Sequence, residues 1–95
     1  MQLNFSSYTL IEKHIVLEDI DPVVFYGVNN SHLQMIKSLF PKLRIVARDN
    51  VIRVLGDEDE MAKFEECVES MQRHVLKYNA FTDEDILDII KGRKT

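Results

Sequence analysis

The side chains that could carry out catalysis are few and lie far apart in the sequence. The histidines, His14, His32 and His74, fall on different predicted elements, whereas metal ligands usually come at short spacings. The single cysteine, Cys67, precedes Val68 beside the apolar stripe of a predicted helix, which favours a half-buried structural thiol over a nucleophile. No group combines a nucleophile, a base and an orienting partner, so we expect no catalytic, cofactor-binding or metal site.

Phosphate-binding and acid–base motifs are also lacking. The C-terminal segment 92–95 ends like a Walker loop, but it has neither the upstream glycine nor the preceding strand. The acidic run 57–60 lies at the predicted start of a helix, where carboxylates favour the positive end of the dipole. We predict that this run caps the helix rather than binding a metal.

Two features could bind a ligand. The turn Gly27-Val28-Asn29-Asn30 leads into a helix, and a helix N-terminus after such a turn presents unpaired amides to an anion. Basic residues of the next predicted hairpin are the second feature. Strand alternation should place the arginines of this hairpin on one sheet face, near two lysines. These arginines either contact a ligand or only solvate that open face. The candidate contacts for RNA or a partner are Gly27, Asn29, Asn30, Lys37, Lys42, Arg44, Arg48 and Arg53.

Hydrophobic periodicity predicts the elements that position these groups, and they define an α+β fold. In order, they are a strand over 13–18, a short helix over 22–26, a helix over 31–40, a hairpin over 43–55, a long helix from about 58 to 76 and a short helix over 83–91. The contiguous apolar run 15–17 suits a strand that is buried on both faces or lies at the sheet centre. The long helix has an apolar stripe made of Met61, Phe64, Val68, Met71 and Val75.

Two capping-box patterns, Ser31 with Gln34 and Thr82 with Asp85, predict where helices begin. The last short helix is unusually apolar for its length, so part of it is expected to contact a partner. The candidate partner-helix contacts are Ile86, Leu87, Ile89 and Ile90.

Bulk properties narrow the class further. The chain has 95 residues, of which 45% are hydrophobic, and a net charge of −4. This length indicates one domain, and the charge disfavours a general polyanion or membrane binder. The N-terminus lacks the basic and apolar regions of a secretory signal, and a lone cysteine suits a reducing compartment, so we expect an intracellular location.

The order of elements resembles that of a KH domain. The KH signature is Gly-x-x-Gly followed by apolar residues three and six positions later, and the matching positions are Gly27, Asn30, Leu33 and Ile36. The resemblance implies a three-stranded sheet packed on helices, in a β-α-α-β-β-α core followed by a short C-terminal helix. Asn30 departs from the second glycine, and the loop lacks the basic pair often found there.

A more specific resemblance covers nearly the whole chain. The segments Ile15–Tyr26, Leu39–Arg48 and Ile52–Glu58, together with the run FTDEDILDII, are similar to the N-terminal region of bacterial PhoH-like proteins. These are cytoplasmic P-loop ATPases associated with phosphate starvation and with suspected links to RNA metabolism. The resemblance implies that the ATPase domain, with its ATP and magnesium, lies downstream of this domain in the intact protein.

We therefore expect an N-terminal arm over residues 1–12, a KH-like domain over 13–78, and a helix over 81–92 leading toward the ATPase domain. The first functional hypothesis is that the domain positions single-stranded RNA for that ATPase. The second is a domain that docks on the ATPase domain or forms a homo-oligomer without binding nucleic acid. A free-standing small enzyme is the third hypothesis, and the sequence favours it least.

Overall fold

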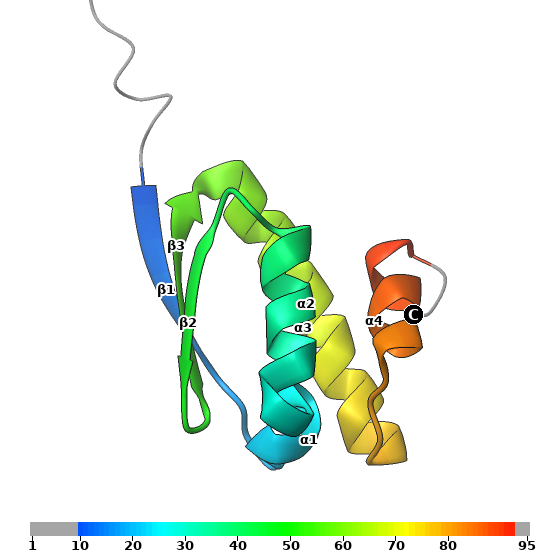
Figure 1. Cartoon of the computed structure of the whole chain (residues 1–95). Coiled ribbons are helices and arrows are strands. Elements are labelled where there is room, and N and C mark those ends of the chain that lie inside the picture. Colours follow the sequence, from blue (N-terminus) through cyan, green and yellow to red (C-terminus); the bar gives the residue numbers. More distant parts are fainter. Residues whose placement is uncertain (1–9, 93–95) are drawn as a thin grey trace, which may run out of the picture.

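A computed structural model gives the structure of the chain and describes residues 10–92. Its elements, in order, are β1 (Leu10–Val16), α1 (Pro22–Tyr26), the 3₁₀ turn η2 (Val28–Asn30), α2 (Ser31–Leu39), β2 (Arg44–Arg48), β3 (Val51–Asp57), α3 (Glu58–Tyr78) and α4 (Asp83–Ile90). The fold is α+β: one layer is a three-stranded antiparallel sheet, and the helices lie together on one side of it (Figure 1). Within the described part of the chain, no helix is long and apolar enough to cross a membrane.

The sheet has the strand order β1-β3-β2, so β3 is its central strand. Ile52 of β3 pairs with Ile15 on one side and with Ala47 on the other. The expectation that the run 15–17 forms the sheet centre is therefore wrong, because β1 is an edge strand. Its apolar run arises differently: Ile15 packs against the core, Leu17 is buried just beyond the strand, and Val16 is 45% exposed.

The boundaries of β1 also differ from the prediction. The strand begins at Leu10, three residues before the predicted start, and ends at Val16. Residues 10–12 of the predicted arm therefore belong to the sheet, because they continue the antiparallel pairing with β3 as far as Asp57. The rest of the predicted arm, residues 1–9, lies outside the described residues.

Helix α3 has the apolar stripe that its periodicity predicts. All five members of the stripe are buried, at no more than 3% exposure. The side chain of Asp57 accepts a hydrogen bond from the Glu60 amide (2.9 Å) and caps the helix. The acidic run thus begins α3 as expected, with three carboxylates in the first turn.

Only one of the two predicted capping boxes forms. Thr82 and Asp85 exchange both hydrogen bonds, at 3.0 and 3.2 Å. The predicted Ser31 box is wrong, since Ser31 already has helical angles and the N-cap is Asn30, whose side chain makes no cap bond. The left-handed conformation of Asn30 (φ 60°) turns its side chain away from the extended geometry that a capping side chain needs.

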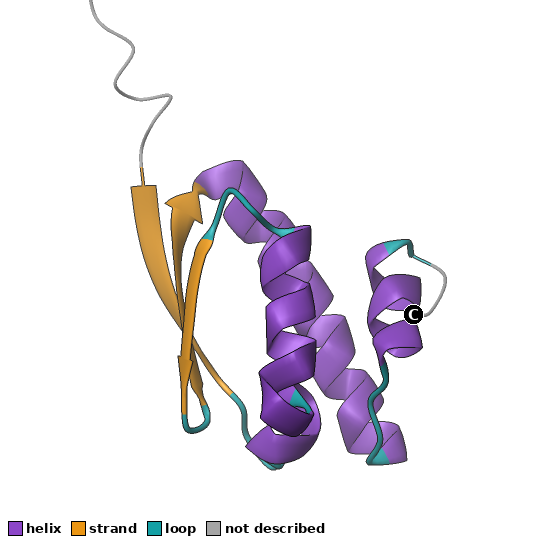
Figure 2. Ribbon diagram, in the orientation of Figure 1, coloured by secondary structure: helices purple, strands orange, loops and turns teal. Residues whose placement is uncertain are grey.

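Helix α4 completes the core of the described residues. Ile86 is fully buried and Ile89 is 7% exposed. Figure 2 shows α4 beside the other helices and on the side away from the sheet.

Candidate functional site

The turn between α1 and α2 has an unusual backbone. Gly27 has φ 83° and ψ 168°, a region open almost only to glycine. Asn29 and Asn30 both adopt left-handed angles, which asparagine tolerates better than most residues. The Asn30 amide donates to the Gly27 carbonyl (3.0 Å), and the Ser31 amide donates to that of Val28. Two of the amides that the sequence predicts to face an anion are therefore used inside the turn.

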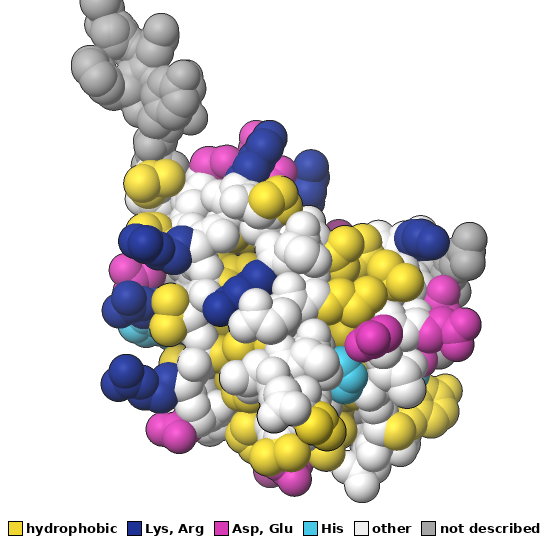
Figure 3. All heavy atoms as spheres, viewed as in Figure 1, with side chains coloured by type: hydrophobic (Ala, Val, Ile, Leu, Met, Phe, Trp, Pro, Cys, Tyr) yellow, Lys and Arg dark blue, Asp and Glu magenta, His cyan; other side chains and the backbone are white. Residues whose placement is uncertain are grey.

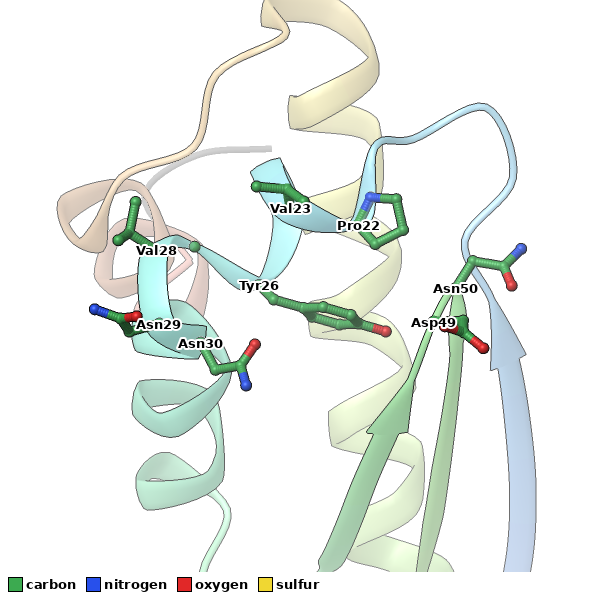
Figure 4. Close-up of a pocket in the computed structure, with 9 residues that line it drawn as sticks. Pro22, Val23, Tyr26, Val28, Asn29, Asn30, Asp49 and Asn50 are labelled. Atoms are coloured by element: carbon green, nitrogen blue, oxygen red, sulfur yellow. The ribbon is translucent and has the colours of Figure 1, made fainter.

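A groove of about 740 Å³ lies between this turn and the tip of the β2–β3 hairpin. Figure 4 shows the two turns on opposite sides of it, with the Tyr26 ring reaching from α1 toward the hairpin tip. The lining residues are Pro22, Val23, Tyr26, Gly27, Val28, Asn29, Asn30, Asp49 and Asn50. Among the candidate contacts, the groove thus brings Gly27, Asn29 and Asn30 together.

Tyr26 is 8% exposed, and its hydroxyl is buried without a hydrogen-bond partner among the described residues. Burial raises the pKa of the Tyr26 phenol above its ordinary value, and the nearby carboxylate of Asp49 raises this pKa further. An unpaired buried hydroxyl is a cost to folding that the rest of the core must offset.

The chemistry of the groove suits an uncharged, flat group better than a phosphate. Among the described residues, no lysine or arginine lines the groove, and the one charged group in its lining is the carboxylate of Asp49. Apolar side chains and a tyrosine ring offer stacking surface, while the amides of Asn29, Asn30 and Asn50 can both donate and accept hydrogen bonds. This combination is typical of sites that hold a base and read its polar edge.

The arginines do share the open face of the sheet, away from the helices. Arg44, Arg48 and Arg53 are exposed, while the residues beside them in the strands face the core. The register places Arg53 opposite Val46, which lies between Arg44 and Arg48 on β2. Contact between these arginines and RNA or a partner stays a prediction.

The three arginines differ in whether a carboxylate of the chain lies near their charge. The Nε of Arg53 is 3.9 Å from the Oε2 of Glu12, and the same carboxylate oxygen is 3.0 Å from the Nε2 of His14. Arg44 and Arg48 have no ion-pair partner within residues 10–92. Both belong to the edge strand β2, and Arg48 directly precedes Asp49 at the groove.

The two candidate lysines occupy different places. Lys42 is exposed in the turn just before β2, close along the chain to Arg44. Lys37 lies in the last turn of α2 and is half-buried. Helix α2 lies on the opposite side of the sheet from the open face, so Lys37 does not join the arginines (Figure 1).

The four candidate partner contacts of α4 also separate. Ile86 and Ile89 pack into the core, whereas Leu87 and Ile90 are half-buried. Figure 3 shows hydrophobic side chains gathered between α2 and α4, and basic side chains along the sheet side of the molecule. Only Leu87 and Ile90 are placed to meet a partner while α4 stays docked.

Sequence reasoning missed the partners of the histidines. The helical pattern predicts His74 on the exposed side of its helix, but its side chain is 11% exposed and its Nε2 lies 3.1 Å from Asp85 Oδ2. His32 stands between α1 and the start of α4, with its Nε2 3.8 Å from Asp83 Oδ1. The only hint in the sequence is that both aspartates begin a helix that needs something to pack on. Within residues 10–92, no cluster of three or more side chains could hold a metal ion.

Cys67 is half-buried and packs against the core, as expected of a structural thiol. Burial raises the pKa of the Cys67 thiol, and the adjacent Glu66 raises it further. The thiol therefore stays protonated at neutral pH and is a poor nucleophile.

The chain matches no protein-family model, no curated protein and no solved structure.

Proposed function

We propose that this chain is a non-catalytic, KH-like domain that positions single-stranded RNA for an ATPase domain of the same cytoplasmic protein. The order of strands and helices supports the KH-like part of the proposal, as does the Gly27-to-Asn30 turn between α1 and α2. The resemblance to PhoH-like proteins supports the ATPase part.

One observation carries the proposal: a groove whose lining within residues 10–92 includes no lysine or arginine lies next to the edge strand β2, whose two arginines have no ion-pair partner in the same part of the chain. The groove offers stacking surface and amides for a base. Arg48 directly precedes the hairpin tip that lines the groove, and Arg44 lies further along the same strand. Single-stranded RNA presents unstacked bases and a phosphate backbone together, which is the combination that these two surfaces match.

The arginines, rather than the turn, supply the electrostatic part of this binding. The turn has no cation, and Asn30 occupies the place of the second KH glycine, where its side chain crowds an approaching phosphate. Arg44 and Arg48 are four residues apart on one face of β2, which is roughly 13 Å at the usual rise per residue. That span lets both contact the backbone of one bound strand.

The test is a titration with a mixed-sequence single-stranded RNA at two salt concentrations. We expect binding at low salt that weakens steeply as salt rises, with a slope of about −0.7 per phosphate contact. The Arg44→Ala/Arg48→Ala double variant should bind about tenfold more weakly. Its plot of log affinity against log salt should be less steep by roughly 1.4, because two phosphate contacts are lost.

A matched control removes the same charge from the other side of the molecule. Lys63 and Arg73 are exposed cations on α3, so Lys63→Ala/Arg73→Ala should leave affinity nearly unchanged. Absence of binding at low salt would overturn the proposal. Equal losses in the two double variants would show that only net charge matters and would overturn the role of the arginine face.

A second function is favoured by the hydrophobic surface between α2 and α4 (Figure 3). The half-buried apolar side chains of these two helices are Met35, Leu39, Leu87 and Ile90. This surface suits docking on another domain or on a second copy of the chain. Light scattering of the chain alone and mixed with the ATPase domain distinguishes the two functions. A strict monomer that does not associate with that domain would count against docking.

A further inference from the structure

Phe81 lies in the connection between α3 and α4 and packs against α1, the helix whose residues line part of the groove. It is 7% exposed and stacks on Phe25, with the ring centroids 5.4 Å apart and the planes 20° from parallel. Phe25 is fully buried in α1 and directly precedes Tyr26, whose ring lines the groove. The segment before α4 therefore supports the back of one groove wall.

His32 connects the same elements from the other side. Its Nδ1–H donates to the carbonyl oxygen of Phe25 (3.2 Å), and its ring meets Phe81 edge to face at 5.2 Å. A Cβ atom added at Gly27 would lie 2.8 Å from this ring, so the ring also packs directly against the turn. One side chain thus contacts α1, the turn and the segment leading into α4.

Several contacts hold α4 in this position. The His74 Nε2 lies 3.1 Å from Asp85 Oδ2, and Asp85 also closes the capping box with Thr82. The buried side chains of Ile86 and Ile89 add apolar contact with the core. Phe81 is placed against Phe25 only while this segment stays docked.

From these contacts we propose that docking of the 79–90 segment fixes the geometry of the groove, with His32 as the positioning residue. In the Gly27-to-Asn30 turn, Val28, Asn29 and Asn30 are exposed, and Asn29 and Asn30 both have left-handed backbone angles, so the shape of the turn depends on what packs behind it. Undocking of α4 loosens the turn and weakens ligand binding. The link to binding rests on the proposed function, but the coupling between α4 and the turn does not.

The coupling is tested by amide hydrogen exchange of Gly27 and Asn30, whose N–H groups donate to Val23 and to Gly27 itself. In Phe81→Leu we expect both amides to exchange about tenfold faster, because the stacking contact behind the turn is lost. Phe40→Leu is the matched control. Phe40 is equally buried at 6% and also meets another ring, that of Phe64, but it lies at the far end of α2.

A pair of His32 variants separates positioning from bulk packing. His32→Asn places an amide N–H near the position of Nδ1, whereas His32→Leu keeps side-chain volume and removes the donor. We expect exchange at the turn to stay close to that of the original chain in His32→Asn and to rise in His32→Leu. Equal behaviour of these two variants would overturn the role of His32.

The proposal as a whole is overturned if Phe81→Leu and Phe40→Leu accelerate the turn amides equally at matched global stability. RNA titration of the same variants keeps the two proposals distinguishable. Where RNA binds, Phe81→Leu should weaken it about tenfold, whereas Phe40→Leu should not. Unchanged RNA affinity in Phe81→Leu would overturn the link to binding. Failure of the original chain to bind RNA would overturn the proposed function, and amide hydrogen exchange would still test the coupling between α4 and the turn.

Discussion

The Tyr26 hydroxyl is the single group whose position is hardest to explain by stability alone. It is buried in the groove wall and has no hydrogen-bond partner in residues 10–92. Most buried hydroxyls in folded proteins are paired, so an unpaired one is often kept for a reason other than stability. Here the ring itself is useful, because it forms part of the groove surface.

Replacing this residue separates the ring from the hydroxyl. We expect Tyr26→Phe to raise the free energy of unfolding by about 1 kcal/mol, because the desolvated oxygen is removed and the packed ring remains. Urea unfolding measures the change. Tyr78→Phe is the control, since Tyr78 is 58% exposed and should show almost no effect. A clear loss of stability in Tyr26→Phe would mean that the hydroxyl has a partner in solution.

At the scale of elements, two similar sequence patterns begin two helices in different ways. Both pair a hydroxyl residue with a polar residue three positions later, yet only Thr82 caps its helix. Ser31 is already inside α2, because the left-handed Asn29 and Asn30 bring the chain into the helix from a tight turn. Local pattern alone could not distinguish them.

This difference predicts unequal effects of the same mutation. Thr82→Ala should cost about 1 kcal/mol of unfolding free energy, since the Asp85 amide loses its cap. Ser31→Ala should change stability by no more than a few tenths of a kcal/mol, because its hydroxyl caps nothing. Chemical denaturation of both variants provides the comparison. A larger loss in Ser31→Ala would contradict the observed start of α2.

At the scale of the whole molecule, two groups within residues 10–92 with raised pKa values, Tyr26 and Cys67, make stability depend on alkaline pH. The ordinary pKa values are 9.0 for Cys67 and 10.0 for Tyr26, and burial is the main cause of the increase in both. The folded state keeps these protons to higher pH than the unfolded state. Stability from this source is therefore complete below about pH 9 and falls as pH rises through the raised values.

We expect the free energy of unfolding to fall between about pH 8 and about pH 10.5 by more in the original chain than in Tyr26→Phe/Cys67→Ala, which lacks both groups. Urea unfolding at several pH values measures the difference in slope. Tyr78→Phe, which alters an exposed phenol, should follow the original chain. Parallel slopes in the original chain and the double variant would contradict the assignment.

Sequence alone determined the features that depend on neighbours along the chain. The stripe of α3, the acidic cap at Asp57 and the hairpin with its shared arginine face followed from periods of about 3.6 and about 2 residues. These periods specify which side chains share a face of one element. The turn conformation at Asn30 was also accessible, since asparagine tolerates left-handed angles.

Tertiary structure decided everything that depends on which elements meet. The edge position of β1 follows from the pairing of β3 with both other strands, and strand order has no local signature. The groove exists because the hairpin tip reaches the α1–α2 turn, and the burial of His32 and His74 exists because α4 packs back onto the helices. The physical reason is that long-range packing is set by the combined burial of all the apolar faces, which no single segment specifies.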